Sequence, residues 1–529
     1  MLSILPALVL ALAPPASPGF TVGIELPSQV PVPLPVERAL ADMGIGYAGF
    51  YVANTPAWEP PEAGTTEAMV ALCRRLGLKF TLDCHHRDPS AASIRTAAAA
   101  PGFLGVKIDE LTHIRLLYPE FTPPERDPML ADPATFTSLE QASAAAEAGL
   151  RTLHGKLTGA GAPGVISAEV WPSLLHSAAR VGMTPCPKVC KEFYSPVSLA
   201  VGMGAALQYG RPLWVDVDMW YFALVPGHPA DEVRANLQLA YWMGADLAYL
   251  EGTGYNLIPA GKQGIPFSLL TQVDGERYQL TPHGEMLKGF CTKYLPANPR
   301  PYTFRDVRPT MAIIRFDDTD VGQKSWGADR LYGTTRLKPD RDTAAWLGLW
   351  NVLTHGSTGA DGIAYFKASI KHTGADDRYH QSVTPSYLTD PASAEHRFFV
   401  PLNGAVVFDE RVEYERLRGI PLLFLTGKAV SPATLAAIRR CVGEGALCVA
   451  WAPLARASGL APKEARAGVR RLGKGRLALT EDFQSPETRR LIGRFLGKPD
   501  EIRYTFGSRS VVLKRVTDNS VEVRLIPGG

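Results

Sequence analysis

The sequence predicts an α/β protein with two main parts, a (β/α)8 TIM barrel followed by a smaller α/β unit. Short apolar runs alternate with helix-period segments over about 275 residues, which is typical of βα units around a parallel sheet. Eight such runs can be counted, the number that closes a TIM barrel. After Arg300 a second alternating series begins, and a chain of 529 residues is long enough for more than one core.

The composition is that of a globular protein. Hydrophobic residues make up 46% of the chain and charged residues 20%, and the formal net charge is +3. No Lys/Arg run is present that would bind nucleic acid or an anionic membrane, so neither is an expected partner. Seven cysteines are scattered without a Cys-x-x-Cys pair, so no structural zinc and no cofactor are expected.

Residues 1–19 combine an apolar stretch with a small-residue exit, which is typical of a secretory signal peptide, although the basic segment that usually precedes it is missing. We therefore expect a secreted or periplasmic protein. No other segment approaches the roughly 20 uncharged residues that are needed to span a bilayer.

The barrel elements follow one another in order. The predicted strands are Phe20–Glu25, Gly44–Val52, Lys79–Cys84, Phe103–Asp109, Gly164–Val170, Thr184–Cys190, Pro212–Asp218 and Asp246–Glu251. The predicted helices between them include Thr65–Leu76, Phe136–Leu157, Pro172–Val181, Val197–Tyr209 and Ala230–Met243. An open doubly wound sheet is the alternative, but no Gly-x-Gly-x-x-Gly turn follows an early strand.

Almost every predicted strand ends on an acidic residue. In order, the exits carry Glu25, Asp83 with His85 and His86, Asp109 with Glu110, Glu169 with Trp171, Lys188 with Glu192, Asp216 with Asp218 and Trp220, and Glu251 with Tyr255 and Asn256. The C-terminal ends of barrel strands form the active-site floor. Carboxylates interleaved with Trp and Tyr are typical of a saccharide cleft. We predict that substrate is bound by Glu25, Lys188, Asp216, Trp171, Trp220, Tyr255 and Asn256.

Two strand exits carry the strongest catalytic signal. Strand 103–109 ends in Asp109 and Glu110, and adjacent strand residues diverge, so the partner of either is expected across the barrel. Trp214, Asp216 and Asp218 share the inward face of their strand by period two. The plain alternatives are helix caps and buried or surface ion pairs.

The second unit contains a βαβ arrangement with a glycine turn, which indicates a flavodoxin-like domain. Its predicted strands are Met311–Phe316, Ile363–Phe366, Gly404–Phe408, Pro421–Leu425 and Ala446–Trp451, with a helix over Pro432–Gly443. The acidic stretch 317–320 lacks the other ligands of a calcium loop and is predicted to be a solvated strand exit. The tail is predicted to form antiparallel strands at Ile502–Thr505, Ser510–Val516 and Val521–Leu525.

This order of parts resembles the β-galactosidases that carry an amidotransferase-like trimerisation domain. The resemblance implies a glycoside hydrolase barrel over 20–299, an amidotransferase-like domain over 300–498 and a small β tail over 499–529. An active amidotransferase would carry a Gly-x-Cys-x-Gly elbow, whereas this chain has Leu425-Thr-Gly-Lys428. We therefore expect the second domain to be structural or to mediate homo-oligomerisation.

The resemblance also implies roles for particular residues. Such retaining enzymes carry an Asn-Glu acid/base at strand four and a glutamate nucleophile at strand seven. Here Glu110 matches the acid, Asp109 replaces the asparagine, and strand seven ends in Asp218. If the first strand is miscounted, the pair becomes Glu169 and Glu251. In a third reading, Lys107-Ile-Asp109 is similar to the Lys-x-Asp of α-galactosidase-type enzymes, whose aspartate is the nucleophile.

The resulting hypothesis is an exported glycosidase that acts on a carbohydrate. Glu110 is the expected general acid, and Glu251 or Asp218 the second carboxylate. The alternative is a catalytically inactive barrel that binds carbohydrate or assembles a complex. A metal-dependent hydrolase that uses Asp83, His85 and His86 comes third, because adjacent strand residues point to opposite faces and do not easily share one ion.

Overall fold

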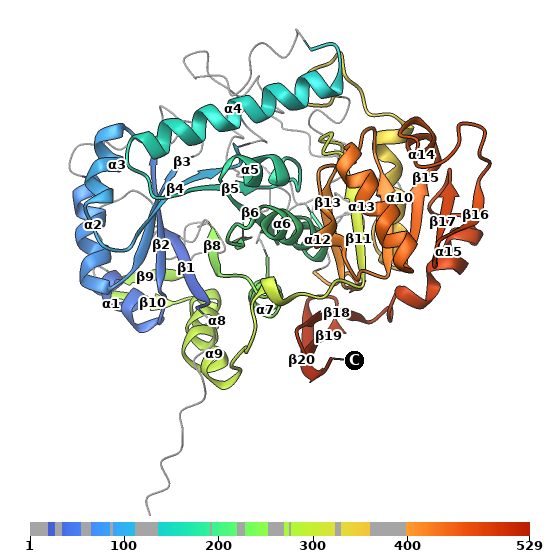
Figure 1. Ribbon diagram of the computed structural model, residues 1–529. Coiled ribbons are helices and arrows are strands. Elements are labelled where there is room, and N and C mark those ends of the chain that lie inside the picture. The colour runs from blue at the N-terminus through green and yellow to red at the C-terminus, as the bar shows by residue number, and fades with distance from the viewer. Residues whose placement is uncertain are drawn as a thin grey trace, which may run out of the picture.

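The computed structural model describes residues 19–26, 34–53, 65–84, 88–111, 136–190, 193–219, 228–251, 269–274, 277–322, 330–359 and 398–528. Its first part is a closed barrel of eight parallel strands in chain order, with β1 also paired to β8 (Figure 1). The predicted TIM barrel is therefore confirmed, including the count that makes 103–109 the fourth strand. The strands are β1 (Thr21–Leu26), β2 (Tyr47–Ala53), β3 (Lys79–Cys84), β4 (Phe103–Asp109), β5 (Val165–Glu169), β6 (Thr184–Val189), β7 (Trp214–Asp218) and β8 (Leu247–Glu251).

Helices surround the barrel on its outer side. They are α1 (Leu34–Asp42), α2 (Thr65–Leu76), α3 (Ala91–Ala98), α4 (Leu139–Gly159), α5 (Leu175–Val181), α6 (Ser195–Tyr209) and α7 (Ala230–Trp242). Local sequence sets several starts: the side chain of Ser138 accepts from the backbone N–H of Gln141 and caps α4. Helix α6 is buried along almost its whole length, which indicates that it is covered on both sides.

The barrel is followed by a short connecting region. It contains the antiparallel pair β9 (Leu270–Asp274) and β10 (Arg277–Leu280), then α8 (Pro282–Gly289), the π-helical turn η4 (Phe290–Tyr294), α9 (Leu295–Ala297) and the 3₁₀ turn η5 (Phe304–Asp306). Within the described part of the chain, no helix is long and apolar enough to cross a membrane.

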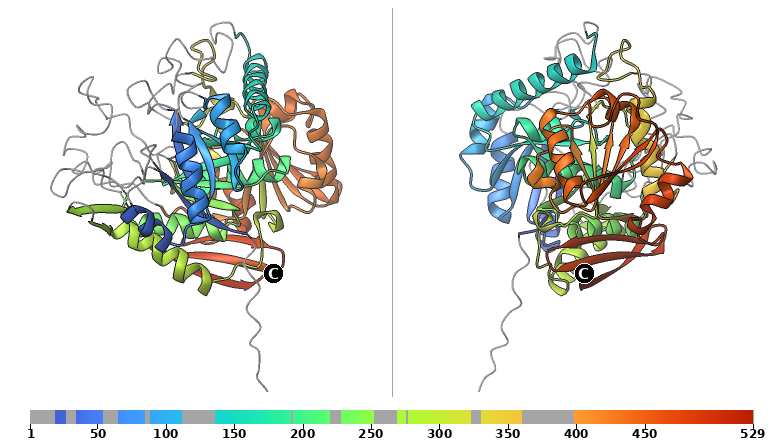
Figure 2. Two further views of the ribbon diagram at one scale, coloured as in Figure 1. Left: turned by 90° about the vertical axis from the view of Figure 1, so that its left-hand side faces the viewer. Right: turned by 45° about the vertical axis from the view of Figure 1, so that its right-hand side comes forward.

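The second part is built on a six-stranded sheet in the order β13-β11-β14-β15-β17-β16, and Figure 2 shows it beside the barrel. All neighbours are parallel except β16 and β17. Its elements are β11 (Met311–Arg315), α10 (Arg341–Leu353), β13 (Ala405–Asp409), α12 (Tyr414–Leu417), β14 (Leu422–Thr426), α13 (Pro432–Glu444), β15 (Leu447–Trp451), α14 (Ala452–Ala457), β16 (Gly468–Leu472), β17 (Gly475–Thr480), α15 (Pro486–Ile492) and η8 (Gly493–Phe495). The predicted strand Ile363–Phe366 lies outside the described residues.

The C-terminal tail forms a separate four-stranded sheet in the order β12-β18-β19-β20. Its strands are β12 (Leu402–Asn403), β18 (Glu501–Phe506), β19 (Arg509–Thr517) and β20 (Ser520–Pro527). The three predicted antiparallel strands are thus present. The fourth strand, β12, comes from the segment just before β13 and pairs in parallel with β18. The tail is therefore attached to the second unit by backbone hydrogen bonds.

The acidic stretch that follows β11 is buried, so its prediction as a solvated strand exit was wrong. Asp317 and Asp320 are 7% and 4% exposed, and Asp318 is fully buried. Arg315 forms an ion pair with Asp318 and also donates to the backbone oxygen of Asp320. Thr343 donates to the side chain of Asp320 at 2.8 Å. The stretch is buried because Arg315 and α10 supply the polar partners that water was expected to supply.

The two parts pack directly on each other through α6 and β13. Gly204 lies in α6, and a Cβ atom built on it would lie 1.5 Å from the carbonyl oxygen of Val407 in β13. Helix backbone therefore contacts strand backbone, a contact that only glycine allows. On the other side of the same helix, the hydroxyl of Ser198 donates to the backbone oxygen of Lys188 in β6 at 3.0 Å.

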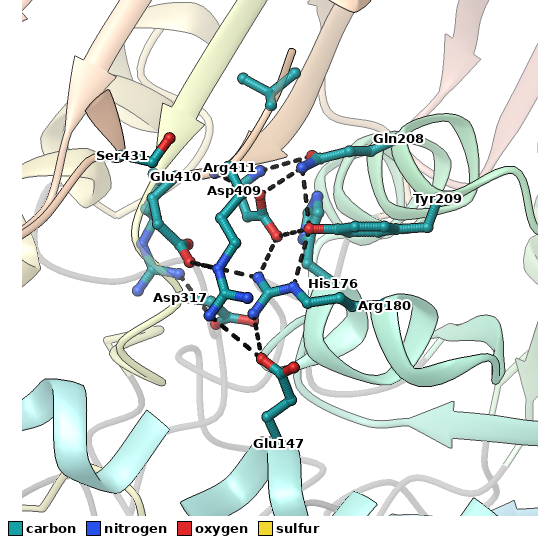
Figure 3. A network of polar contacts seen from close by, with 12 residues as sticks. Glu147, His176, Arg180, Gln208, Tyr209, Asp317, Asp409, Glu410, Arg411 and Ser431 are labelled. Carbon is teal, nitrogen blue, oxygen red and sulfur yellow. Dashed lines mark hydrogen bonds and ion pairs between the residues drawn. The ribbon is translucent and has the colours of Figure 1, made fainter. Parts of the chain in front are cut away.

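A polar network completes this interface around Asp409, the last residue of β13 (Figure 3). Its carboxylate accepts from Arg180 at 2.5 Å, from Gln208 at 2.5 Å and from the hydroxyl of Tyr209. Arg180 also donates to Glu147 of α4 at 2.7 Å. The side chains that hold Asp409 thus come from α5 and α6 of the barrel.

Replacing Gly204 by Ala is expected to destabilise the protein by roughly 1–3 kcal/mol or more, because a backbone oxygen cannot rotate away from the added methyl group. Urea unfolding would measure the loss. Gly155→Ala is the matched control, since a Cβ atom added at Gly155 in α4 would meet no other group within 4 Å. That variant is expected to gain roughly 0.5–1 kcal/mol. Equal stability of the two variants would contradict close packing at Gly204.

Candidate active site

A buried ammonium group lies at the centre of the acidic residues that were predicted at the strand ends. Lys188 of β6 is fully buried, and its Nζ atom lies 2.9 Å from Asp109, 3.3 Å from Asp218 and 3.8 Å from Asp216. It also lies 3.3 Å from Glu110 and in contact with Glu251. We call these five carboxylates, which come from the ends of β4, β7 and β8, the Lys188 ring. The structure thus brings together five predicted site residues around a sixth.

The backbone at the end of β4 explains how two adjacent carboxylates reach one ammonium. Asp109 is the last residue of the strand, and Glu110 follows it with φ of 51°. This left-handed conformation is uncommon for residues other than glycine and costs roughly 1–2 kcal/mol. It turns Glu110 back toward the barrel axis. The expectation that Asp109 and Glu110 diverge was therefore wrong, because Glu110 is not part of the strand.

A second ammonium lies deeper in the barrel. Lys107 of β4 forms an ion pair with Glu25 and another with Asp83, at 3.3 Å. It also donates to the hydroxyl of Tyr249 at 3.1 Å. Tyr249 in turn donates to Asp216 at 2.6 Å. A continuous set of polar contacts therefore links Glu25, predicted to bind substrate, to the Lys188 ring.

Below these polar groups the lumen is apolar. Tyr47, Cys186, Trp214 and Leu247 belong to one cluster that also includes Ile166, Ala168 and Tyr249. Val215 and Val217 belong to the larger core outside the strands. The predicted inward face of β7, with Trp214, Asp216 and Asp218, is thus confirmed. An apolar floor excludes water from the base of the site, which strengthens the electrostatic interactions above it.

The barrel interior holds more carboxylates than ammonium groups, so some carboxylates must retain protons. Burial raises the pKa of Glu251 well above its ordinary value, and Asp109, Asp216 and Asp218 raise it further against the opposing effect of Lys188. Burial also raises the pKa of Asp216 to about 6, against both lysines. Burial alone would lower the pKa of Lys188, but the surrounding carboxylates raise it well above its ordinary value. Lys188 therefore stays charged while the ring shares protons.

Exposure distinguishes the members of the ring. Glu110 and Glu251 are 7% and 5% exposed, whereas Asp109 is 2% exposed and both Asp216 and Asp218 are fully buried. Glu110 and Glu251 are therefore the members of the ring that reach toward the barrel mouth.

Two other predicted residues lie apart from the ring. Ala168 lies in the apolar cluster of the lumen, so the period-two alternation places Glu169 on the helix-facing side of β5. There the carboxylate of Glu169 accepts a hydrogen bond from the hydroxyl of Ser167 at 2.5 Å. Trp171 is 3% exposed and packs edge-on against Phe193, with ring centroids 5.6 Å apart. Six further residues named in the sequence analysis lie outside the described residues: His85, His86, Glu192, Trp220, Tyr255 and Asn256.

Tyr249 was not identified from the sequence, and Lys107 was not included among the residues predicted to bind substrate. The signal that could have found both is the alternation that placed Asp216 and Asp218. Counting back by two from Asp109 and Glu251 gives Lys107 and Tyr249 on the same inward faces.

Asp109, Asp216 and Glu251 also have donor oxygens within 4.8 Å of one another, which is close enough to hold a metal ion. The ammonium of Lys188 already lies against each of these side chains. The cation that compensates their charge is therefore part of the chain, and we place no metal ion there.

No protein-family model matches the chain, and no curated protein matches its sequence. Solved structures with a similar chain path include a GH5_18 protein from Streptomyces cattleya in complex with GlcNAc, at 18% identity over 56% of this chain and 84% of that chain, with a TM-score of 0.39. Another is the exo-β-1,4-mannosidase Op5Man5 from Opitutaceae bacterium strain TAV5, at 11% identity over 96% and 86% of the two chains, with a TM-score of 0.43. At such identities and TM-scores, these similarities do not bear on what the chain does.

Proposed function

We propose that the protein is a glycoside hydrolase that cleaves O-glycosidic bonds with two carboxylates of the Lys188 ring. The observation that carries the proposal is the convergence of five carboxylates from β4, β7 and β8 on one ammonium at the C-terminal end of the barrel. Paired carboxylates with perturbed pKa values are the groups that glycoside hydrolysis requires.

The proposed reacting pair is Glu110 and Glu251, because these two carboxylates reach toward the barrel mouth. Both contact the Nζ atom of Lys188, so the contacting oxygens are at most roughly 6 Å apart, twice the length of a hydrogen bond. Retaining enzymes place their carboxyl groups about 5 Å apart. The separation therefore supports retention of configuration.

The chemistry then follows two steps. Glu110 protonates the leaving oxygen while the carboxylate of Glu251 attacks the anomeric carbon, which gives a glycosyl ester. Glu110 next removes a proton from water, the water attacks the same carbon, and Glu251 is released. Lys188 assists because its positive charge favours the ionised form of Glu251, the form that can attack.

Replacing Glu110 by Ala and then Glu251 by Ala tests the pair. Each change is expected to lower hydrolysis of an aryl glycoside by at least about a thousand-fold, and Glu110→Gln should do the same with the fold intact. Azide assigns the roles: with Glu110→Ala it should give a glycosyl azide of the substrate's configuration, and with Glu251→Ala one of inverted configuration. Nuclear magnetic resonance of the product measures both.

A panel of aryl β-mannosides, β-galactosides and β-glucosides supplies the substrates. If the two variants gave the opposite azide products, the roles of Glu110 and Glu251 would be exchanged. If Asp218→Ala gave the inverted azide and Glu251→Ala did not, Asp218 would be the nucleophile. Glu522→Gln is the control, because Glu522 lies in the tail sheet and pairs with Arg524. Normal turnover of every ring variant would contradict the proposed role of these carboxylates. Binding without any product from the wild-type protein on every substrate would instead favour a barrel that only binds carbohydrate.

The second part of the chain is proposed to be flavodoxin-like and related to amidotransferase domains. The strand order β13-β11-β14-β15-β17 supports this, since numbering these strands along the chain gives the order 2-1-3-4-5 of doubly wound sheets. The turn after β14 has the sequence Leu425-Thr-Gly-Lys428 and lacks the Gly-x-Cys-x-Gly elbow of an active amidotransferase. Lys428 in this turn forms ion pairs. Its nitrogen contacts Asp340 and lies 3.2 Å from Asp342. The lack of a cysteine in this turn supports a structural or oligomerising role for the second part. We also propose that the protein is exported.

A further inference from the structure

Three side chains with metal-binding atoms meet just outside the Lys188 ring. Cys190 follows β6, His228 precedes α7, and Glu232 lies in the first turn of α7. Each is 1% exposed. One donor atom from each lies within 4.8 Å of the other two. Residues from two separate segments, nearly 40 positions apart in sequence, therefore converge on one buried point.

The backbone holds this cluster from two sides. Cys190 has φ of 68°, and its backbone N–H donates to the hydroxyl of Ser195 at 3.2 Å. A left-handed conformation outside glycine has to be stabilised by its surroundings. The backbone oxygen of His228 accepts from Nε2 of His283 at 2.8 Å. The thiol and the imidazole are thus positioned by contacts that do not involve each other.

The donor set is that of a zinc site. Thiolate, imidazole and carboxylate bind Zn²⁺ at about 2.3, 2.0 and 2.1 Å, which places tetrahedral ligand atoms roughly 3.3–3.6 Å apart. Nδ1 of His228 and Oε2 of Glu232 are already 3.0 Å apart. The thiol has to approach them by roughly 1 Å, well within the reach of a side-chain adjustment. Calcium and magnesium prefer sites made of oxygen atoms, which this one is not.

Charge also favours a divalent ion. A thiolate and a carboxylate together carry two negative charges, so one Zn²⁺ ion leaves the buried cluster neutral. Without an ion, burial raises the pKa of Cys190 well above its ordinary value, and Glu232 and Asp218 raise it further, so the thiol keeps its proton. Binding of zinc would release that proton.

We propose that Cys190, His228 and Glu232 bind one Zn²⁺ ion that joins the end of β6 to the start of α7. Cys190 lies two residues after Lys188, so the ion would hold the strand end that carries the central ammonium. The sequence did not predict a zinc site, because a site with one cysteine leaves no Cys-x-x-Cys pattern.

Elemental analysis tests the proposal. The full chain, purified from zinc-supplemented cells without chelator, is expected to contain about one zinc per chain. Cys190→Ser and His228→Gln should each reduce the content at least about ten-fold, since each removes one of three ligands. Cys73→Ser is the matched control: Cys73 is a buried free cysteine of α2, outside the cluster, and this variant should keep its zinc.

A second measurement needs no variant. Cobalt(II) added to chelator-treated wild-type protein should produce the absorption of a cobalt–thiolate bond, and zinc should abolish it. Zinc should also raise the melting temperature of the chelator-treated protein. Zinc below about 0.1 per chain together with no cobalt–thiolate absorption would overturn the proposal, as would full zinc content in a folded Cys190→Ser variant. Because none of these readouts measures hydrolysis, the result is independent of the proposed function.

Discussion

Replacing Lys188 by Met is expected to lower kcat/KM for glycoside hydrolysis by roughly a hundred- to a thousand-fold, the usual cost of losing one preorganised electrostatic group. The reason lies in the ring: Lys188 contacts all five carboxylates and opposes the rise in the pKa of Glu251. Without the ammonium, Glu251 stays protonated to higher pH and cannot act as a nucleophile. The acidic limb of the profile of kcat/KM against pH should therefore move to higher pH.

Lys188→Met should also destabilise the protein, by an amount that depends on pH. Removing one partner of a buried ion pair costs roughly 3–5 kcal/mol. Lys188 opposes the rise in the pKa of Glu251 and of Asp216, so in Lys188→Met these two groups have folded pKa values further above their unfolded values. Such groups lose their stabilising contribution as the pH rises. The deficit against wild type should thus be larger near pH 8 than near pH 5. Urea unfolding at the two pH values measures it.

Lys107→Met is the matched control, since it removes the other barrel ammonium, whose ion pairs are with Glu25 and Asp83. It should destabilise the protein, but the acidic limb should move less than in Lys188→Met. Wild-type kcat/KM in Lys188→Met, or an equal stability deficit at both pH values, would contradict the central role of Lys188.

The barrel could be predicted in detail because its signals are local. Strands β3 and β4 and helix α2 have the predicted bounds, since apolar runs and helical periodicity are properties of short segments. Period two also identified the inward face of β7. The same local rules placed carboxylates at the strand ends, which is why the acidic ring was visible in the sequence.

What could not be predicted depends on contacts between distant segments. Lys188 was expected to bind substrate, but its central position depends on the relative heights of β4, β6, β7 and β8 in the closed barrel. The left-handed backbone of Glu110 leaves no trace in its residue type. The burial of Asp317–Asp320 requires Arg315 and α10 to take the place of water, a contact that no local pattern encodes.

The interface between the two parts also depends on contacts between distant segments, and Asp409 lies at its centre. Asp409→Ala is expected to destabilise the protein by roughly 3–5 kcal/mol, because Arg180 loses the carboxylate that lies 2.5 Å from it and keeps only Glu147 and the more distant Glu410. Gln208 and Tyr209 would also lose their acceptor. Chemical unfolding followed by tryptophan fluorescence measures the loss.

The pH dependence of wild type provides a further check. Burial alone would raise the pKa of Asp409, but His176, Arg180 and the hydroxyl of Tyr209 together hold it below its ordinary value. A group with a lowered folded pKa stabilises the protein above its unfolded pKa, and that contribution is lost as the pH falls. The difference between wild type and Asp409→Ala should therefore shrink below about pH 4.

Two variants separate the charge from the packing. Glu522→Gln removes an exposed partner of Arg524 and should change stability by less than about 1 kcal/mol. Arg180→Met combined with Asp409→Ala should be more stable than the sum of the single losses implies, because each single change already removes the interaction between the two side chains. Additive losses would mean that the two side chains act independently. The interface would then depend on the close packing of α6 against β13 rather than on this ion pair.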